Sequence, residues 1–161
     1  MAIVNPVTLS GSPPINLRHT IRLIVRDMYE AKLGTSVHEY KQGIWHINSV
    51  TNFPALHFTS GPESLVNAEV NTNKDFKMNI TLIGYVRAQN PDALDEQLDN
   101  FIHAVKRVAY EERDTKFGDT TGLIIDALVG DISVITEFLP VGIGGFEMDL
   151  TIHYRTFGIR V

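Results

Sequence analysis

The stretch FEMDLTIHYRTF, residues 146–157, alternates apolar and polar side chains almost without interruption. Successive side chains of a β-strand point to opposite faces of a sheet, so this alternation predicts a strand with one apolar face and one charged face. The apolar face holds Phe146, Met148, Leu150, Ile152 and Tyr154, and the other holds Glu147, Asp149, Thr151, His153 and Arg155. The apolar face requires a core, and the charged face is a candidate functional surface.

Other stretches predict the rest of a sheet. The segment FKMNITLIGYVR at 76–87 alternates in the same way and predicts a second long strand. Residues 132–139 and 55–59 predict two shorter strands, whereas LIIDALV at 123–129 fits either a short helix or a buried strand. The polar segment 59–75 predicts a long connection, and VGIGGF at 141–146 predicts a hairpin turn, because a strand rather than a helix follows its glycines.

Two segments have the period of an amphipathic helix. The first begins at Leu17 after the potential N-cap Asn16 and stops at Gly34. The second follows Asn90, a good N-cap, and places Pro91 at its first position. Strands and helices in this order predict an α+β fold, with a mostly antiparallel sheet and two main helices packed on one of its faces.

The length of 161 residues fits one domain. Three prolines and no helical period predict an extended arm at residues 1–15, and the single domain is then expected at 16–161. The arm carries the apolar residues Ile3, Val4 and Val7, which we expect to contact a neighbouring subunit.

Composition and motifs argue against several functions. The net charge of −5 is unusual for a protein that grips nucleic acid, and zero cysteines exclude a disulfide framework and a thiolate metal site. The six histidines lack the spacing of metal ligands, and no nucleophile motif is present. We therefore expect no metal, no cofactor and no enzymatic activity. Without an apparent secretory signal or membrane segment, synthesis is expected in the cytoplasm and no membrane partner is expected.

The sheet face turned away from the helices is not uniformly polar. If the strands pair as expected, it carries apolar and charged residues together: Ile83, Tyr85, Ile135, Leu139, Glu137, Glu147, Asp149, His153 and Arg155. Apolar anchors with a charged rim are typical of a protein interface. The alternative is that segment 123–129 or the long connection covers this face. The charged residues are expected to be exposed, so that Arg155→Glu would change stability little.

The order of these segments resembles the tail terminator proteins of long-tailed bacteriophages, the family of the lambda minor tail protein U. The resemblance lies in LRHTIRLIVRDMYEAKLG, then PALHFTSGPE, then FKMNITLIGYVRAQNPDALDEQLDNFIHAVKRVA, and finally DISVITEFLPVGIGGFEMDLTIHYRTF. It extends over residues 16–157 in pattern and includes the pair Tyr154-Arg155 after the alternating strand. Chain size and the lack of motifs are also similar to the tail terminators of T-five-type siphophages.

This resemblance implies a homo-oligomeric ring, usually a hexamer, that caps the tail tube protein, stops tube polymerisation and joins a neck or head-completion protein. The chain would then be a virion component made in the host cytoplasm, and DNA would pass through the lumen without specific binding. The alternatives are a small cytoplasmic α+β ligand-binding or regulatory domain that acts as a dimer, and an enzyme of an unrecognised family.

Overall fold

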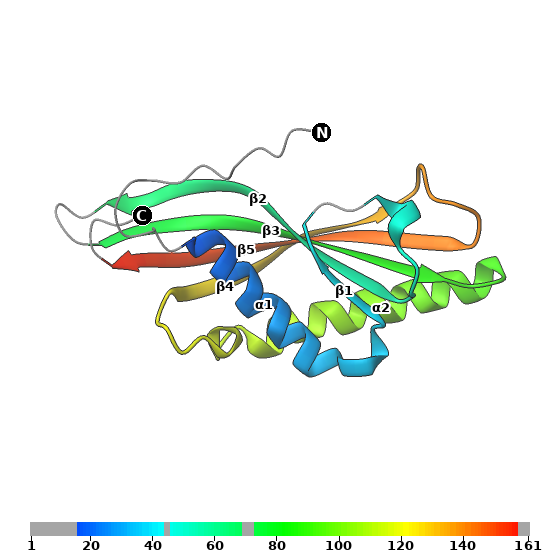
Figure 1. Ribbon diagram of the computed structural model, residues 1–161, viewed down its shortest axis with the longest axis horizontal. Helices are drawn as coiled ribbons and strands as arrows, with labels where there is room; N and C mark the ends of the chain where they lie inside the picture. The colour runs from blue at the N-terminus through cyan, green and yellow to red at the C-terminus, as the bar shows by residue number, and fades with distance from the viewer. Residues whose placement is uncertain (1–15, 44–45, 69–72, 158–161) are drawn as a thin grey trace, which may run out of the picture.

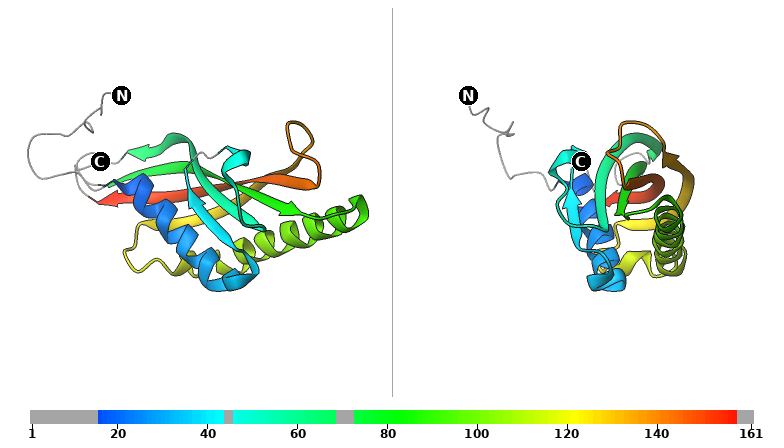
Figure 2. Two further views of the ribbon diagram at one scale, coloured as in Figure 1. Left: turned by 45° about the vertical axis from the view of Figure 1, so that its right-hand side comes forward. Right: turned by 90° about the vertical axis from the view of Figure 1, so that its right-hand side faces the viewer.

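A computed structural model of the protein describes residues 16–43, 46–68 and 73–157. The predicted arm at 1–15, with Ile3, Val4 and Val7, lies outside these residues. Two long helices lie on one side of a long, twisted sheet, as Figure 1 and the two turned views of Figure 2 show. The predicted α+β class and the single domain with both main helices on one face are confirmed.

The sheet contains five strands in the order β1-β2-β3-β5-β4. Strand β1 pairs in parallel with β2, and every other neighbouring pair is antiparallel. The strands are β1 (Glu39–Gln42), β2 (Ala55–Ala68), β3 (Asn73–Arg87), β4 (Ile124–Ile135) and β5 (Ile143–Phe157). The two strands expected to be longest, β3 and β5, lie in the centre, where they pair along their whole length.

Both helices begin where the sequence predicts. Helix α1 (Leu17–Leu33) is capped by Asn16, whose side chain accepts a hydrogen bond from the His19 backbone N–H at 3.1 Å. Helix α2 (Pro91–Glu112) is capped by Asn90 in the same way, with 2.8 Å to the Ala93 backbone nitrogen. Three short 3₁₀ helices complete the fold: η1 (Gly34–Ser36), η2 (Ile47–Ser49) and η3 (Lys116–Gly118).

The core lies between the helices and the apolar face of the sheet. Across it, the hydroxyl of Tyr29 on α1 donates to the backbone carbonyl of Val105 on α2 at 2.9 Å, which satisfies a fully buried polar group. The strands contribute the largest share of the core: Leu56, Phe58, Met78, Ile80, Leu82, Phe146, Met148, Leu150, Ile152 and Tyr154.

Two segments differ from the sequence prediction. Segment 123–129 and residues 132–135 form one strand, β4, because irregularities in its pairing after Ile124 and Val129 absorb the break in the apolar pattern. Residues 136–139, predicted as strand, lie beyond the last β4–β5 pair. The polar segment 59–75 is mostly strand rather than connection, because β2 continues to Ala68 through a bulge between Ser60 and Glu63.

Within the described residues, β1 pairs only with residues 55–58 of β2, so the outer edge of β2 beyond Phe58 has no strand partner in this part of the chain. Two features obstruct this edge. Pro62 offers no backbone N–H, and the Arg18 guanidinium on α1 donates to the backbone carbonyl of Gly61 at 2.7 Å.

Candidate functional site

The candidate site is the face of the sheet that the helices do not cover, here called the open face. The register of β3 with β5 places Ile80 opposite Leu150 on the helix side, and Thr81 opposite Asp149 on the open face. The alternation predicted from residues 146–157 therefore holds along the strand. Glu147, Asp149, His153 and Arg155 share the open face, as expected.

Asp149 lies in the middle of the open face and is held by its neighbours on β3. Its Oδ1 accepts hydrogen bonds from the Thr81 hydroxyl at 3.1 Å and from the Asn79 amide at 3.4 Å. Gly130 of β4 lies on its other side, where an added Cβ would be 3.3 Å from the Asp149 Cβ. The carboxylate is thus fixed on a rigid surface between two strands.

Arg155 is not a freely solvated charge. Its guanidinium donates two hydrogen bonds to Asp75 on β3, at 2.6 and 2.9 Å, and the His153 ring nitrogen Nε2 lies 3.6 Å from the same carboxylate. Asp75 is buried, and the bond from Arg155 lowers the pKa of its carboxyl group below the usual range. The expectation that Arg155→Glu changes stability little assumed an exposed, weakly paired side chain. With Arg155 bonded to a buried carboxylate, we instead expect this substitution to destabilise the protein, because it would place a second carboxylate against Asp75.

Asp75 could not be predicted as the partner of Arg155, because the polar composition of residues 59–75 indicates a connection rather than a strand. Asp75 and Arg155 lie opposite each other in the β3–β5 pairing, which can be inferred only when β3 is known to begin at Asn73.

The apolar anchors predicted on the open face lie at the other end of the sheet, partly covered. Tyr85 is only 7% exposed, and Ile83, Ile135 and Leu139 are half-buried around it. They form a second, smaller core with Val50, Ala55, Ile47, Phe53 and Ile143. The cover comes from residues 46–54, not from segment 123–129 or the connection that the sequence suggested. Their role as an interface stays a prediction, and Tyr85 is not available on the surface of one chain.

Beneath the same cover lies a buried histidine. His57 is 1% exposed, with its ring edge-on to Tyr85 at 5.6 Å between centroids. Its Nε2 is 3.3 Å from the Glu39 carboxylate on β1, which also pairs with Lys41 at 3.4 Å. Burial lowers the pKa of His57, and the hydrogen bond to Glu39 only partly offsets this effect.

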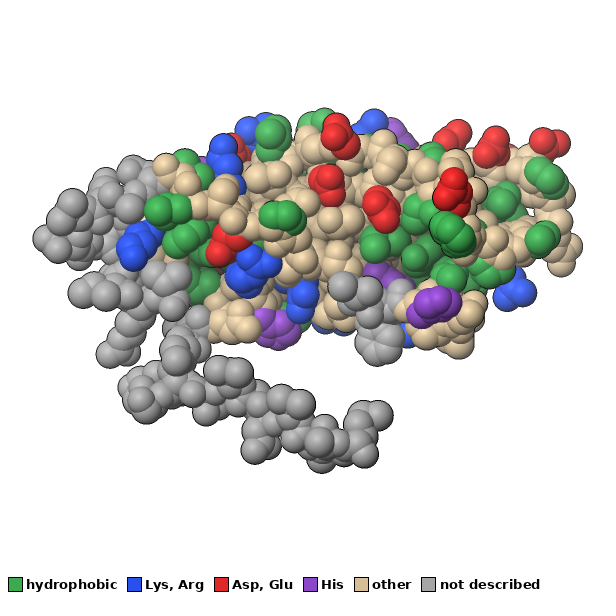
Figure 3. Space-filling view, turned by 90° about the horizontal axis from the view of Figure 1, so that it is seen from above, with side chains coloured by type: hydrophobic (Ala, Val, Ile, Leu, Met, Phe, Trp, Pro, Cys, Tyr) green, Lys and Arg blue, Asp and Glu red, His purple; other side chains and the backbone are tan. Residues whose placement is uncertain are grey.

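Acidic side chains gather at the end of the molecule that carries the β4–β5 hairpin and the start of α2. Most red side chains occupy this half in Figure 3, while most lysines and arginines occupy the other. Among the described residues, none of the eight forms an ion pair: Asp92, Asp95, Glu96, Asp99, Asp131, Glu137, Glu147 and Asp149. Arg87 also lies at this end, but the acidic side chains there outnumber it, so this end carries a net negative field.

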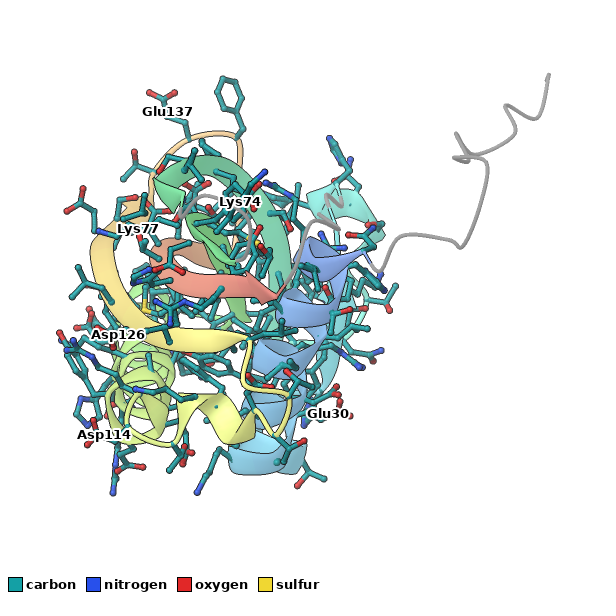
Figure 4. All side chains as sticks on the ribbon, turned by 90° about the vertical axis from the view of Figure 1, so that its left-hand side faces the viewer. Glu30, Lys74, Lys77, Asp114, Asp126 and Glu137 are labelled. Atoms are coloured by element: carbon teal, nitrogen blue, oxygen red, sulfur yellow. The ribbon has the colours of Figure 1, made fainter. Side chains whose placement is uncertain are left out.

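Sequence reasoning missed two residues at the tip of this hairpin. Phe138 is 94% exposed and Val141 is 103% exposed, whereas their neighbour Leu139 turns into the second core. Figure 4 shows the labelled Glu137 on the projecting hairpin, pointing away from the body of the molecule. The segment FLPVG contained the signal, since it places apolar residues beside the turn residues Pro140 and Gly142.

The opposite end of the open face holds a small cavity of about 170 Å³. Lys77, Arg113, Asp126 and His153 line it, and Lys77 and Asp126 are labelled in Figure 4. Arg113 donates to both oxygens of Asp126, at 3.0 and 3.1 Å, and holds the pKa of that carboxyl group at about 2. Arg113 and Asp126 in this cavity are thus paired with each other, and the His153 ring faces Asp75 outside it. Across residues 16–43, 46–68 and 73–157 no group of three His, Asp or Glu side chains could hold a metal ion.

In the described part of the chain, no helix is long and apolar enough to cross a membrane. No family model matches the sequence, and no curated protein matches it. Among solved structures, this chain is similar to a chain in the virion of a native gene transfer agent particle. That similarity has a TM-score of 0.43 and 9% identity, and it covers 89% of this chain and 96% of the other. A likeness at this TM-score carries no conclusion about what this chain does.

Proposed function

We propose that this protein is a structural subunit of a bacteriophage virion and acts there as a tail terminator. In this role, copies of the chain form a ring on the end of the tail tube, stop its polymerisation and offer a joining surface to a neck or head-completion protein. The chain is made in the host cytoplasm and is not an enzyme. The proposal starts from the sequence resemblance over residues 16–157 and is supported by the open face.

The observation that carries the proposal is the construction of the open face. A structural ring subunit needs a stiff surface with fixed side chains, and it needs no pocket that gathers reactive groups. On the open face, Asp149 is held by Thr81 and Asn79, and Arg155 is held by Asp75. An enzyme would instead be expected to converge nucleophiles, acids and bases on one cleft.

The charge distribution also supports this role. The eight unpaired carboxylates at the hairpin end repel the phosphate backbone of DNA. A ring that lets DNA slide through its opening benefits from such a surface, because contacts between cationic side chains and phosphates would slow the passage.

Deletion of the gene in its phage tests the proposal. We expect particles without properly joined tails and, by electron microscopy, free tubes of irregular length, because nothing stops tube growth. Complementation with the intact gene should restore tails of uniform length. Mass spectrometry of purified wild-type particles should find the protein in several copies per virion.

Two outcomes would reject the proposal. Tubes of normal length in the deletion strain would remove the terminator role, and absence of the protein from purified particles would remove the structural role. A stable dimer in solution that binds a small metabolite would favour the alternative of a regulatory domain.

A further inference from the structure

The hairpin tip carries two unfavourable features at one residue. The aromatic ring of Phe138 is 94% exposed, although removing such an apolar ring from water is favourable. Its backbone also adopts φ 61°, a left-handed conformation that is uncommon for residues other than glycine, asparagine and aspartate. Strain together with an exposed aromatic ring at a projecting tip points to a contact that one chain alone does not make.

A matching apolar groove lies elsewhere on the same chain. It has a volume of about 350 Å³ and is lined mainly by Leu33, Val37, Pro54, Val86 and Phe101, with the amides of Gln97 and Asn100 at α2. A second, more polar cavity of about 550 Å³ contains His38, Phe53 and Arg87.

These two openings are neighbours. In three pairs of consecutive residues, one residue lines the apolar groove and the next lines the polar cavity: Val37 and His38, Pro54 and Phe53, and Val86 and Arg87. The apolar groove and the cationic cavity therefore lie side by side at the β1 edge of the sheet.

The charges of tip and cavity are complementary. Glu137 precedes Phe138, is exposed, and has no ion pair with any described residue. Arg87 is also exposed, and its one contact found in residues 16–43, 46–68 and 73–157 is with the ring face of Phe53, at 5.9 Å from the ring centre. A tip that offers an apolar ring beside a carboxylate fits a groove that lies beside an arginine.

The topology decides whether tip and groove can belong to different copies. The hairpin joins β4 to β5, whereas the groove is lined by residues of α2, by Val86 of β3 and by residues just before β1 and β2. Both lie at the same end of the strands. The hairpin leads into Ile143, which pairs with Arg87 at the end of β3, and the groove residue Pro54 directly precedes Ala55, which pairs with Tyr85 near the same end. Figure 2, in the view onto this end, shows the hairpin and the β1 side apart from each other.

We propose that the β4–β5 hairpin tip of one copy docks into the β1-edge groove of the next copy, with Phe138 in the apolar groove and Glu137 beside Arg87. Because the two surfaces differ, the contact is head-to-tail between neighbouring copies. Repeated with a constant rotation, it closes a ring. This contact deepens the proposed function, on which it rests for its place in the virion.

Analytical ultracentrifugation of the full chain tests the contact. Phe138→Asn suits the left-handed backbone and removes the ring, so it should melt at the wild-type temperature or above it. Its self-association should still weaken by about tenfold or more. The matched control is Val66→Asn at the far end of β2, where a 47% exposed apolar side chain is removed without affecting association.

A charge exchange tests the ionic part of the contact. Glu137→Arg and Arg87→Glu should each weaken association, and the double variant should restore it, because the two charges again have opposite signs. Wild-type protein that remains monomeric at its solubility limit, or a double variant no better than the single variants, would overturn the proposal.

Disulfide trapping locates the contact, since the chain has no cysteine of its own. A mixture of Val141→Cys and a differently tagged Asn100→Cys protein should give a mixed dimer on oxidation, whereas Val141→Cys with Val66→Cys should not. Equal yields from both mixtures would reject the docking mode. If trapping fails but purified particles contain the protein, this contact is rejected and the proposed function stands. If trapping succeeds in solution but particles lack the protein, the contact stands and the proposed function is rejected.

Discussion

Arg155 is a partly exposed residue whose side chain compensates a buried charge. Its side chain is 41% exposed, yet both of its hydrogen bonds go to a carboxylate, Asp75, whose side chain is only 10% exposed. Removing the guanidinium would leave Asp75 with the cost of burial and without the two hydrogen bonds from Arg155.

We therefore predict that Arg155→Gln lowers the free energy of unfolding by about 1–3 kcal/mol at neutral pH, a range that allows for the partial exposure of the pair. Arg107→Gln is the control, because it breaks an exposed pair with Glu111 within α2 and should change the free energy of unfolding far less. Urea denaturation measures both. Since the pKa of Asp75 is lowered in the folded wild type, its contribution to the free energy of unfolding is present above about pH 4 and is lost below it. The difference in unfolding free energy between the wild type and Arg155→Gln should therefore become smaller in acid.

His57 gives a second prediction at this scale. Burial lowers its pKa in the folded protein, so the unfolded chain binds the proton more readily, and stability falls as the pH drops below about 6.5. One such group changes the unfolding free energy by no more than about 1.4 kcal/mol per pH unit. His57→Gln should flatten the dependence between about pH 6.5 and 5, and His103→Gln, an exposed change on α2, should not. Thermal melts over this pH range measure the effect. If the melting temperature changes with pH equally in the wild type and both variants, His57 is not the group responsible.

Among the elements, α2 approaches the sheet closely because β3 has a glycine beneath it. Phe101 of α2 and Phe146 of β5 meet edge-on over Gly84, with 5.4 Å between their ring centres. A Cβ at position 84 would lie 2.2 Å from Phe146 and 2.9 Å from Phe101, so neither ring could keep its place.

Gly84→Ala should therefore destabilise the protein by about 1–3 kcal/mol through overpacking. Gly144→Ala on β5 is the matched control, because its new methyl group would meet the flexible Leu94 side chain at 3.3 Å. We expect the control to cost clearly less in the same urea titration. An unchanged midpoint for Gly84→Ala would mean that α2 can move away from the sheet without penalty.

How well each element could be predicted depends on the length of its pattern. Helices α1 and α2 have several turns of apolar period and an asparagine cap each, and β5 has an unbroken alternation, so local sequence defines them. Strand β2 was predicted only over residues 55–59, because Gly61 and Pro62 are turn residues. Its continuation to Ala68 depends on its pairing with β3 around a bulge.

Strand β1 and the covering of part of the open face are determined by contacts between residues that are far apart in the sequence. Four residues with uniform half-burial give β1 no periodic signal, so its parallel pairing with β2 determines it. The charged row on β5 was predictable from alternation alone. The covering of Tyr85 by residues 46–54 was not, because that segment has no regular pattern and packs through a few apolar side chains.

For the whole molecule, the unequal distribution of charge leads to a prediction about DNA. Wild-type protein should not bind duplex DNA at physiological salt, because its acidic end repels phosphate. Replacing two exposed carboxylates there, Asp131→Lys together with Glu147→Lys, should produce weak binding that falls steeply with added salt. Fluorescence anisotropy with a labelled duplex measures this. The control, Asp27→Lys with Glu30→Lys on α1, changes the net charge equally and should bind less.

The obstructed outer edge of β2 has a consequence before any assembly takes place. A sheet with strands this long would invite open edges of separate copies to join and grow into insoluble fibres. Pro62 and the Arg18 guanidinium on the Gly61 carbonyl deny a passing strand the regular ladder that it would need. The described part of this edge therefore resists strand pairing between copies, which would limit aggregation of newly made chains.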